Sequence, residues 1–517
     1  MTDKRAAKII YQSGEDVAVR LMCQLSGELQ SSKKTIAQLE RRIHNLEGQM
    51  AKNSRNSSMP PSSDRFNKPC PKSLREKTGR RSGGQKGHTG YTLKMSERPD
   101  RVIDHSVAQC ERCNHSLAND LPYEIEKRQV FDVPPARMEV TEHRAEIKIC
   151  PHCNHINKAT FPHRVNAPAQ YGYRLKSIIV YLRTYQLVPY QRTTELMYDL
   201  FGVNLSQGTL DNITRSSSNI LRQSLRQIAD CIAESPVAHF DETGCRVLGK
   251  THWMHVASTS KFTYLELHQK RGKEAIDDIG VLPRLKGRAI HDSFNSYFRY
   301  DGLHGLCNAH HLRELTYLHE QEAQGWAKQM KDCLKDIKKR VDNAKETTGH
   351  LSQDETMQFE TLYQLILEAG CYQNPPPERI SRGKNTVGRQ KKTKARNLLE
   401  RFDRRKKEIL AFMYDFNVPF DNNQAERDIR MTKIQQKISG TFRSEKGAAD
   451  FCRIRSYIST ARKNSVNTIE AIFNAFNGKP FIPDQARCGD LPTPSYVPFG
   501  MQRLPSSYAL EYSSIPT

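Results

Sequence analysis

Two short apolar runs in the second half of the chain each end directly on an aspartate. The run SPVAHF (235–240) is followed by Asp241, and the run GRAIH (287–291) is followed by Asp292. Runs of this length that are rich in β-branched and aromatic residues are typical of strands. Asp is common where strands end, which is the plainer explanation. The alternative is that each strand holds a carboxylate rigidly for chemistry.

Two further strand-like runs lie between these acids. They are THWMHVAS (251–258) and KFTYLELHQ (261–269), and their close spacing after the first run predicts an antiparallel meander. Strands of one sheet that end on neighbouring positions place their last side chains within several ångströms of one another. We therefore expect Asp241 and Asp292 to lie near each other at the tips of their strands.

A third acid, Glu426, lies on a predicted helix for which Asp421 is the candidate N-cap, and falls in its second turn. Three ionised carboxylates in a partly dry site repel one another, and a divalent cation removes that repulsion. Oxygen ligands without Cys or His favour Mg²⁺ or Mn²⁺, and two such ions about 4 Å apart can clamp a phosphoryl transfer. The plainer alternative is that Glu426 pairs with Arg430, four residues later.

The chain is strongly basic. Lys and Arg number 80 against 57 Asp and Glu, a net charge of +23, which favours a polyanionic partner. Nucleic acid is preferred to an anionic membrane because the sequence has no lipidation motif or basic amphipathic anchor. The start, MTDKRAAKII, has no apolar run of secretory type, and no later run is long enough to span a bilayer. We expect a cytoplasmic protein with no membrane partner.

Residues 1–52 are predicted to form a coiled-coil dimerisation helix, because a heptad pattern runs through 21–50. Seven apolar residues occupy the two seam positions, and Ser32 interrupts them once: Leu29, Ile36, Ile43 and Met50 at one, and Leu25, Leu39 and Leu46 at the other. β-Branched residues at one seam position and Leu at the other favour a parallel dimer. One amphipathic helix packed on its own domain has the same pattern.

Residues 53–100 are predicted to form a flexible basic linker. The stretch NSRNSSMPPSSD is too rich in Ser, Asn and Pro to pack. The following stretch, GRRSGGQKGHTG, carries Arg80, Arg81 and Lys86 among glycines. Cationic segments of this kind lie along phosphates or enter a minor groove, so these three residues are candidate DNA contacts. A solvated linker is the alternative.

A doubled cysteine pattern predicts a zinc-binding module over 101–165. CERCNH begins at Cys110 and CPHCNH begins at Cys150, so that Cys113 and Cys153 complete two knuckles. Two knuckles can enclose one structural Zn²⁺ in a tetrahedron of thiolates. The alternating apolar residues between the knuckles predict strands that bring them together, as in a zinc ribbon. Unrelated thiol pairs are the alternative, and three nearby histidines are further candidate ligands: His115, His152 and His155.

Helices are predicted on both sides of the strand-rich segment. In the region 166–232, Gly202 can turn the chain and Ser206 can cap the next helix, as in a DNA-binding helix-turn-helix. Any helical hairpin has the same pattern. The region 316–410 is predicted to be helical and charged. Its last part, 379–407, contains thirteen Lys or Arg and only two acids, which favours contacts with phosphates.

The blocks that carry the three acids resemble those of the insertion sequence sixty-six family of transposases. HFDETGCRV with GKTHWMHVAST is similar to the first catalytic block, and AIHDSFNSYFRYDGLHGLCNAHHLREL to the second. PFDNNQAERDIRMTKIQQKISGTFRSEKGAADFCRIRSYISTARK is similar to the third. NSRNSSMPPSSD, GGQKGHTG and the doubled Cys motif resemble the family's N-terminal half, so the likeness covers about 25–475.

The resemblance implies an α/β fold with a ribonuclease-H-like catalytic core over 233–475, interrupted by the helical insertion and followed by a tail, 476–517. The coiled coil, the zinc module and the helical DNA-binding region precede this core. Carried over, the catalytic triad is Asp241, Asp292 and Glu426, with two Mg²⁺ or Mn²⁺. The family's Cys-x-x-His pattern falls on Cys307 and His310, which we expect to support the acids. His311 competes for the histidine role, and plain helix packing is the alternative for this pattern.

The function that the resemblance implies is cleavage at the ends of a bacterial mobile element and transfer of the freed 3′ hydroxyl into target DNA. Arg427, Arg443 and Lys446 are expected to neutralise phosphates near the acids. The implied partners are terminal inverted repeats, target DNA, a second copy of the chain and other proteins that the element encodes. The alternatives are a DNA-binding regulator that does not cut and a nuclease without strand transfer.

Overall fold

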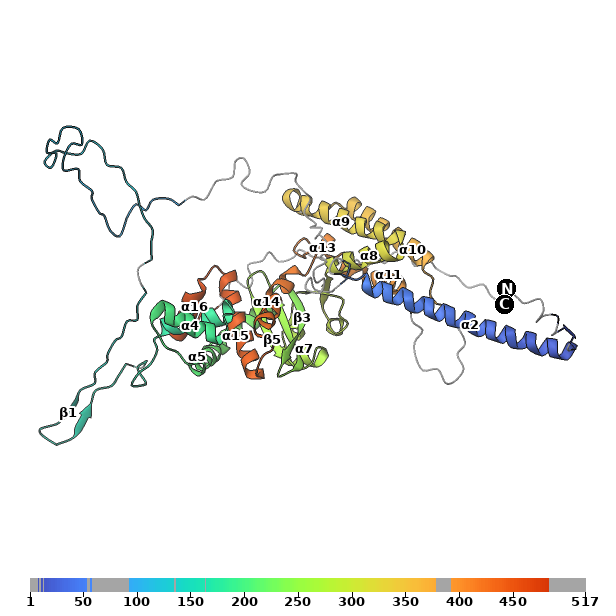
Figure 1. Cartoon of the computed structure of the whole chain (residues 1–517), viewed down its shortest axis with the longest axis horizontal. Coiled ribbons are helices and arrows are strands. Elements are labelled where there is room, and N and C mark those ends of the chain that lie inside the picture. Colours follow the sequence, from blue (N-terminus) through green and yellow to red (C-terminus); the bar gives the residue numbers. More distant parts are fainter. Residues whose placement is uncertain are drawn as a thin grey trace, which may run out of the picture. The chain divides into compact units, whose positions relative to one another are not determined.

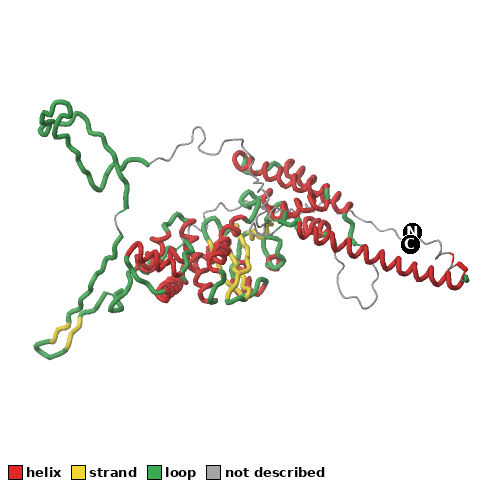
Figure 2. Tube along the Cα trace, viewed as in Figure 1, coloured by secondary structure: helices red, strands yellow, loops and turns green. Residues whose placement is uncertain are grey.

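The computed structural model describes residues 8, 11–12, 14–53, 56–57, 93–133, 136–162, 164–377 and 392–482. The chain divides into two compact units. The smaller unit comprises Pro71–Pro162 and Glu195–Leu205, and the larger comprises Met1–Cys70, His163–Thr194 and Ser206–Thr517. The larger unit is mixed α/β, and the smaller is mostly loop (Figure 2).

The larger unit contains a five-stranded sheet in the order β5-β4-β3-β6-β7. Its strands are β3 (Val237–Val247), β4 (Lys250–Ser258), β5 (Thr263–His268), β6 (Arg288–His291) and β7 (Leu303–Leu306). The predicted antiparallel meander is present as β3, β4 and β5. β6 and β7 run parallel to β3 instead of extending the meander. The chain crosses from β5 to β6 through α7 (Lys273–Ile279) and a short helix, Leu282–Arg284, which a parallel connection requires.

Two helices cover one face of this sheet (Figure 1). They are α14 (Asn423–Ser439), which packs on β3 and β4, and α15 (Glu445–Lys463), which packs on β5. Alternate side chains of the strands form the core beneath them: Cys245, Val247, Met254, Val256 and Leu265, with Ala425, Ile429, Phe451 and Cys452 from the helices. Period-two alternation in the strands therefore decides which side chains face α14.

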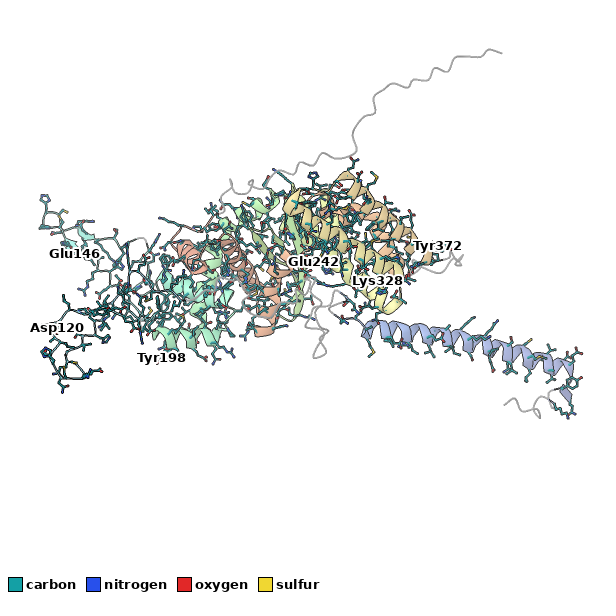
Figure 3. All side chains as sticks on the ribbon, turned by 90° about the horizontal axis from the view of Figure 1, so that it is seen from above. Asp120, Glu146, Tyr198, Glu242, Lys328 and Tyr372 are labelled. Carbon is teal, nitrogen blue, oxygen red and sulfur yellow. The ribbon has the colours of Figure 1, made fainter. Side chains whose placement is uncertain are left out.

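The helices predicted over about 316–410 are present, and they share one apolar core with Ile290 of β6 and Leu306 of β7. These helices are α8 (Asn308–Glu322), α9 (Gly325–Thr347), α10 (Gln353–Gln373), α11 (Lys394–Arg404), α12 (Lys406–Ile409) and α13 (Ala411–Tyr414). Trp326, Tyr363 and Phe402 are fully buried among them. Lys328 on α9 and Tyr372 on α10 are labelled in Figure 3. α12 and α13 contact β7 and so cover that edge of the sheet.

The helical region before the sheet follows the predicted pattern. It contains α3 (Tyr173–Val180), a π-helical turn (Tyr181–Tyr185), α4 (Tyr190–Phe201), α5 (Gln207–Ile220) and α6 (Arg222–Ala233). Gly202 adopts a φ of 66° after α4, a conformation that glycine tolerates best. The Ser206 side chain accepts a hydrogen bond from the Thr209 amide and caps α5. After the sheet, α16 (Thr468–Phe476) returns to pack on α3.

Near the N-terminus, α2 (Glu15–Met50) is a continuous helix of 36 residues. Its seven predicted seam residues all leave more than half of their surface exposed. Packing of α2 on the other described residues therefore does not bury this apolar stripe.

In the smaller unit each cysteine knuckle is closed by a short antiparallel pairing. Gln109 bridges to Ser116 around the first knuckle. β1 (Ile147–Ile149) pairs with β2 (Ile156–Lys158) around the second. The prediction of strands between the knuckles is wrong over the described residues, apart from β1 itself, because the alternating segment there is exposed and pairs with no neighbour.

The close approach of β6 to the segment before β3 supplies a test. Gly287 lies against the backbone of Ser235 and Pro236, and a Cβ built on it would come within 3.0 Å of three of their atoms. The Arg288 amide donates a hydrogen bond to the Pro236 carbonyl, so the backbone cannot move away from an added methyl group without losing this hydrogen bond. We expect Gly287→Ala to lower the free energy of unfolding by about 3 kcal/mol.

Urea unfolding followed by tryptophan fluorescence measures this loss, because Trp253 lies in β4. Gly325→Ala is the matched control, since no atom lies within 4 Å of its added methyl. An equal midpoint for the two variants would show that β6 does not depend on this contact.

Candidate active site

Asp241 and Asp292 are brought level by the pairing of β3 with β6. The last parallel pair in this register joins His239 to Ile290. Continuing the register by two residues places Asp241 beside Asp292. Neighbouring strands lie about 4.8 Å apart, so the two carboxylates are adjacent, as expected.

The position of Asp241 within its strand differs from the prediction. It lies inside β3, paired with Val256 of β4, and not at a strand tip. β3 continues past the end of β6 as one arm of a long hairpin with β4, which holds the Asp241 backbone more firmly than a strand end would. The Asp241 carboxylate accepts a hydrogen bond from the Glu242 amide at 2.9 Å. Alternation puts Asp241 on the face that α14 covers.

Glu242 points to the opposite face and has a different role. Its side chain is buried and pairs with Arg271, whose Nε and Nη2 lie 2.8 and 2.7 Å from Oε1. It also accepts a hydrogen bond from the Tyr297 hydroxyl. Arg271 in turn lies over the ring of Trp253, 4.8 Å from its centroid. Glu242 (labelled in Figure 3) therefore stabilises the sheet beside Asp241.

Asp292 follows the last residue of β6. Its Oδ1 accepts a hydrogen bond from the Phe294 amide at 2.8 Å, which holds the turn after the strand. The residue before it, His291, is fully buried, and its Nε2 lies 2.9 Å from Nδ1 of His304 on β7. Burial lowers the pKa of His291 to about 3, so the ring is neutral. The end of β6 is thus rigid on both sides.

Glu426 lies in the first turn of α14, one turn earlier than predicted. The helix begins at Asn423, and Asn422 occupies the N-cap position. Asp421 instead accepts a hydrogen bond from the Asn423 amide at 3.0 Å and turns the chain before the helix. Glu426 Oε1 lies 3.9 Å from Nδ1 of His310, and among the described ion pairs none joins Glu426 to Arg430. The intrahelical pair with Arg430 is therefore not formed in this structure.

Asn422 joins α14 to the central strand, and the sequence did not single it out. Its Nδ2 donates to the Phe240 carbonyl at 2.8 Å, and its Oδ1 lies 2.8 Å from Nδ1 of His239. Its backbone amide donates to the Cys307 sulfur at 3.2 Å. Asn422 is buried. It fixes the start of α14, and hence Glu426, against β3 just before Asp241.

The electrostatics of Asp241 show that the three acids interact. Burial raises the pKa of Asp241 well above its ordinary value, and the charges of Glu242, Asp292 and Glu426 raise it further. Three carboxylates that repel one another in a half-buried site fit a divalent cation with oxygen ligands, which would relieve the repulsion. The donor set therefore suits Mg²⁺ or Mn²⁺.

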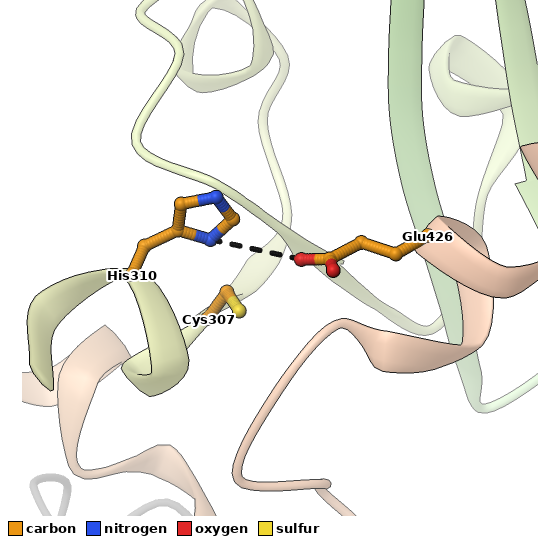
Figure 4. A group of neighbouring side chains, drawn as sticks. All are labelled: Cys307, His310 and Glu426. Atoms are coloured by element: carbon orange, nitrogen blue, oxygen red, sulfur yellow. Dashed lines mark ion pairs between the residues drawn. The ribbon is translucent and has the colours of Figure 1, made fainter. Parts of the chain in front are cut away.

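Cys307 and His310 lie beside Glu426 (Figure 4). One ligand atom from each of the three residues lies within 4.8 Å of the others. Burial raises the pKa of Cys307 to about 12, so that the thiol is protonated in the metal-free protein. His311 is fully buried, with Nδ1 3.0 Å from Asn308 Oδ1 and its ring edge-on to Phe402. Its Nε2 lies 3.4 Å from the hydroxyl of Ser293, the residue after Asp292. The histidine beside Glu426 is His310.

The two cysteine knuckles have the same backbone turn. The amides of Cys110 and Cys150 donate to the carbonyls of His115 and His155, each at 2.9 Å. Hydrogen bonds from backbone amides lower the pKa of both Cys110 and Cys150. Amides that favour the thiolate suit zinc. Among the described residues the four thiols are not all within 4.8 Å of one another.

The three candidate phosphate contacts are exposed, and one of them, Arg427 on α14, lies next to Glu426. Arg443 precedes α15 and Lys446 lies in its first turn. Phe442, just before them, bridges to Val247 at the outer end of β3, about 20 Å along the strand from Asp241. The expectation that Arg443 and Lys446 lie near the acids is therefore not met. Arg80, Arg81 and Lys86 lie outside the described residues.

Three family models match the chain. Residues 168–450 match the Transposase IS66 family, and residues 108–154 match the zinc-finger binding domain of transposase IS66. Residues 15–94 match a family of unknown function. No curated protein matches the chain.

Because the transposase model covers more than half of the 517 residues, the chain belongs to the IS66 family of transposases. Its class is therefore that of an enzyme acting on DNA, with a zinc-finger domain that contains the doubled cysteine motif. Among the described residues no helix is long and apolar enough to cross a membrane.

The raised pKa of Asp241 predicts that this acid destabilises the metal-free fold. At a pH above 3.8, the ordinary pKa of Asp, the native state binds the Asp241 proton more readily than the unfolded chain does. The stability contributed by Asp241 therefore falls as the pH rises from 3.8 through the pKa of Asp241 in the native state. We expect Asp241→Asn to be more stable than the wild type at neutral pH by roughly 1 kcal/mol, with a smaller gain near about pH 4.

Denaturant unfolding of both proteins in the same chelator, at the two pH values, measures the difference. Asp332→Asn, which removes an exposed carboxylate on α9, is the control and should change neither value. A destabilised Asp241→Asn would mean that the carboxylate contributes attractive contacts to the metal-free fold.

Proposed function

We propose that this transposase cuts DNA at the ends of an insertion sequence and joins the freed 3′ hydroxyls to target DNA. The proposal rests chiefly on the convergence of Asp241, Asp292 and Glu426, from β3, the end of β6 and α14, on one electrostatically coupled site. The order of the sheet supports a ribonuclease-H-like core. Three antiparallel strands are followed by two parallel ones, with the acids on the central strand and its parallel neighbour.

The residues of this site have complementary parts in the proposed reaction. Asp241, Asp292 and Glu426 would hold two Mg²⁺ or Mn²⁺ ions, which supply charge stabilisation and an activated oxygen nucleophile. Asn422 holds Glu426 toward the central strand. Arg427 would neutralise a phosphate beside the scissile bond, and Arg443 and Lys446, at the outer end of β3, would contact DNA farther from it. Because the acids are set on paired strands and a tied helix, the backbone needs little reorganisation when DNA binds.

The remaining modules fit the handling of two DNA ends. The knuckles at Cys110, Cys113, Cys150 and Cys153 hold one structural Zn²⁺ and, together with the basic linker and the helices before the sheet, bind the terminal inverted repeats. Target DNA occupies the same catalytic site after cleavage. Other proteins of the element are further partners, and the bacterial cytoplasm, where the element's DNA resides, is the expected location.

A nuclease without strand transfer would use the same acids, and a regulator would use the same DNA-binding modules. The zinc finger and the basic linker favour end recognition over unspecific hydrolysis. The presence of all three acids, coupled through Asp241, argues against a regulator that has lost its chemistry.

The exposed stripe of α2 supports a parallel dimer. Burying Leu25, Leu29, Ile36 and their seam partners against a second copy would remove that apolar surface from water. A dimer gives two active sites, which matches the two ends of an element.

The joining reaction is tested with pre-cut element ends, Mg²⁺ and a plasmid target. We expect the wild type to yield joined products, and Asp241→Asn to lose them by about a thousandfold or more while it retains end binding in a mobility-shift assay. Asp278→Asn, an exposed acid on α7, is the control. Cleavage without joined products would favour the nuclease, and joining by Asp241→Asn would remove Asp241 from the site.

The dimer is tested in the full chain by sedimentation equilibrium. Lys substituted at Ile36 and Leu39 places charges in both seam positions, so we expect the double variant to be monomeric at concentrations where the wild type is a dimer. Gln38→Lys adds a charge to α2 outside the seam and should leave the dimer intact. A monomeric wild type would contradict the proposal.

A further inference from the structure

Two polar atoms next to the proposed catalytic site are enclosed without a hydrogen-bond partner. They are Nδ1 of His310 and Oε1 of Glu426, and the described residues offer a partner to neither. The two atoms face each other at 3.9 Å, too far apart for a hydrogen bond. Enclosed polar atoms are costly unless something binds them. The space between the imidazole nitrogen and the carboxylate oxygen can therefore hold a bound atom, to which both can donate an electron pair.

The Cys307 sulfur completes a three-sided group around that space (Figure 4). Cys307 is the N-cap residue of α8, and His310 lies in the first turn of that helix. The spacing of three residues puts the thiol and the imidazole on the same side of the helix. Glu426 reaches them from α14, which the Asn422 amide ties to the Cys307 sulfur. The three ligands thus come from two elements that are already locked together.

The chemistry of this group selects a different cation from that of the three acids. One sulfur, one imidazole nitrogen and one carboxylate oxygen are a ligand set that suits Zn²⁺, whereas Mg²⁺ prefers oxygen ligands alone. Three protein ligands leave a fourth tetrahedral position for water. We propose that Cys307, His310 and Glu426 form a Zn²⁺ site that withdraws Glu426 from the catalytic acids and so switches the active site off.

Competition for a single carboxylate is the basis of the switch. Among the described residues, Asp241, Asp292 and Glu426 do not form a group within 4.8 Å, whereas Cys307, His310 and Glu426 do. Glu426 is thus directed to the thiol and the imidazole in this structure. Zn²⁺ binding would release the Cys307 proton to solvent and neutralise the carboxylate's charge. The inhibitory part of the inference rests on the proposed function; the binding part does not.

Zinc content of the full chain tests the binding. We expect the wild type to bind one more equivalent of Zn²⁺ than Cys307→Ser and His310→Gln, measured by atomic emission after gel filtration and by competition with a chromophoric chelator. Loss of either ligand should lower the affinity for this additional Zn²⁺ by about tenfold or more. Cys333→Ser, a buried thiol of α9, is the control and should keep the wild-type number.

A second variant distinguishes Zn²⁺ bound by the zinc finger from Zn²⁺ bound at Cys307. Changing Cys110 and Cys113 to Ser should remove the Zn²⁺ of the finger and leave the Zn²⁺ at Cys307. Circular dichroism shows whether each variant is folded, and because His310 is partly exposed, His310→Gln provides an independent test if Cys307→Ser does not fold. Equal zinc content in the wild type and in folded His310→Gln would overturn the proposal.

The effect on Glu426 is measured by joining activity. In excess Mg²⁺, we expect added Zn²⁺ to inhibit the wild type, and His310→Gln to require about tenfold more Zn²⁺ for the same fractional inhibition. Inhibition at equal Zn²⁺ in both would refute the switch. If the wild type binds the additional Zn²⁺ but never joins DNA, the zinc site is supported and the proposed function is refuted.

Discussion

The repulsion between acids that share a half-buried site is the constraint on which the candidate active site depends. Asp241 is half-buried next to Glu242, with Asp292 and Glu426 near enough to raise its pKa. Left to relax, such charges would separate or take up protons. They are held because each lies on backbone that is fixed by other bonds: Asp241 by pairing on β3, Asp292 by the end of β6, and Glu426 by the first turn of α14.

The ties between these elements are polar and buried. Asn422 bonds to the Phe240 carbonyl, to His239 and, through its amide, to the Cys307 sulfur. One short segment therefore connects the central strand, the insertion's first helix and the helix that carries Glu426. The same ties bring Cys307 and His310 against Glu426, so the carboxylate stands between two possible ligand sets, one of oxygens and one that includes sulfur and nitrogen. This placement is the structural basis of the competition between cations that we propose.

Much of the architecture could be predicted from local patterns. Alternation and β-branched residues located β3, β4 and β5, and heptads located α2. Ser206 and Gly202 marked the turn between α4 and α5, and both have the predicted roles. The strands expected between the knuckles are absent from the described residues except for β1, since alternation alone cannot make a strand where no neighbouring strand pairs with it. The expected strand tip at Asp241 is the middle of a strand, because β3 gains a partner in β4 where β6 ends.

By itself, the sequence determined the residue types that can bind a cation, their order along the chain and the family to which they belong. A carboxylate, a thiol or an imidazole is set by the covalent chain, and so is the repeated knuckle that suits zinc. Only the tertiary structure decided which of these groups meet. The register of β3 with β6 places Asp292 beside Asp241. The side-chain amide of Asn422 ties the start of α14 to β3, which holds Glu426 near Asp241 and face to face with His310. Such contacts join residues from 51 positions apart (Val237 and Arg288) to 182 positions apart (Asn422 and Phe240). No local pattern encodes them, because their free energy arises only when distant segments pack together.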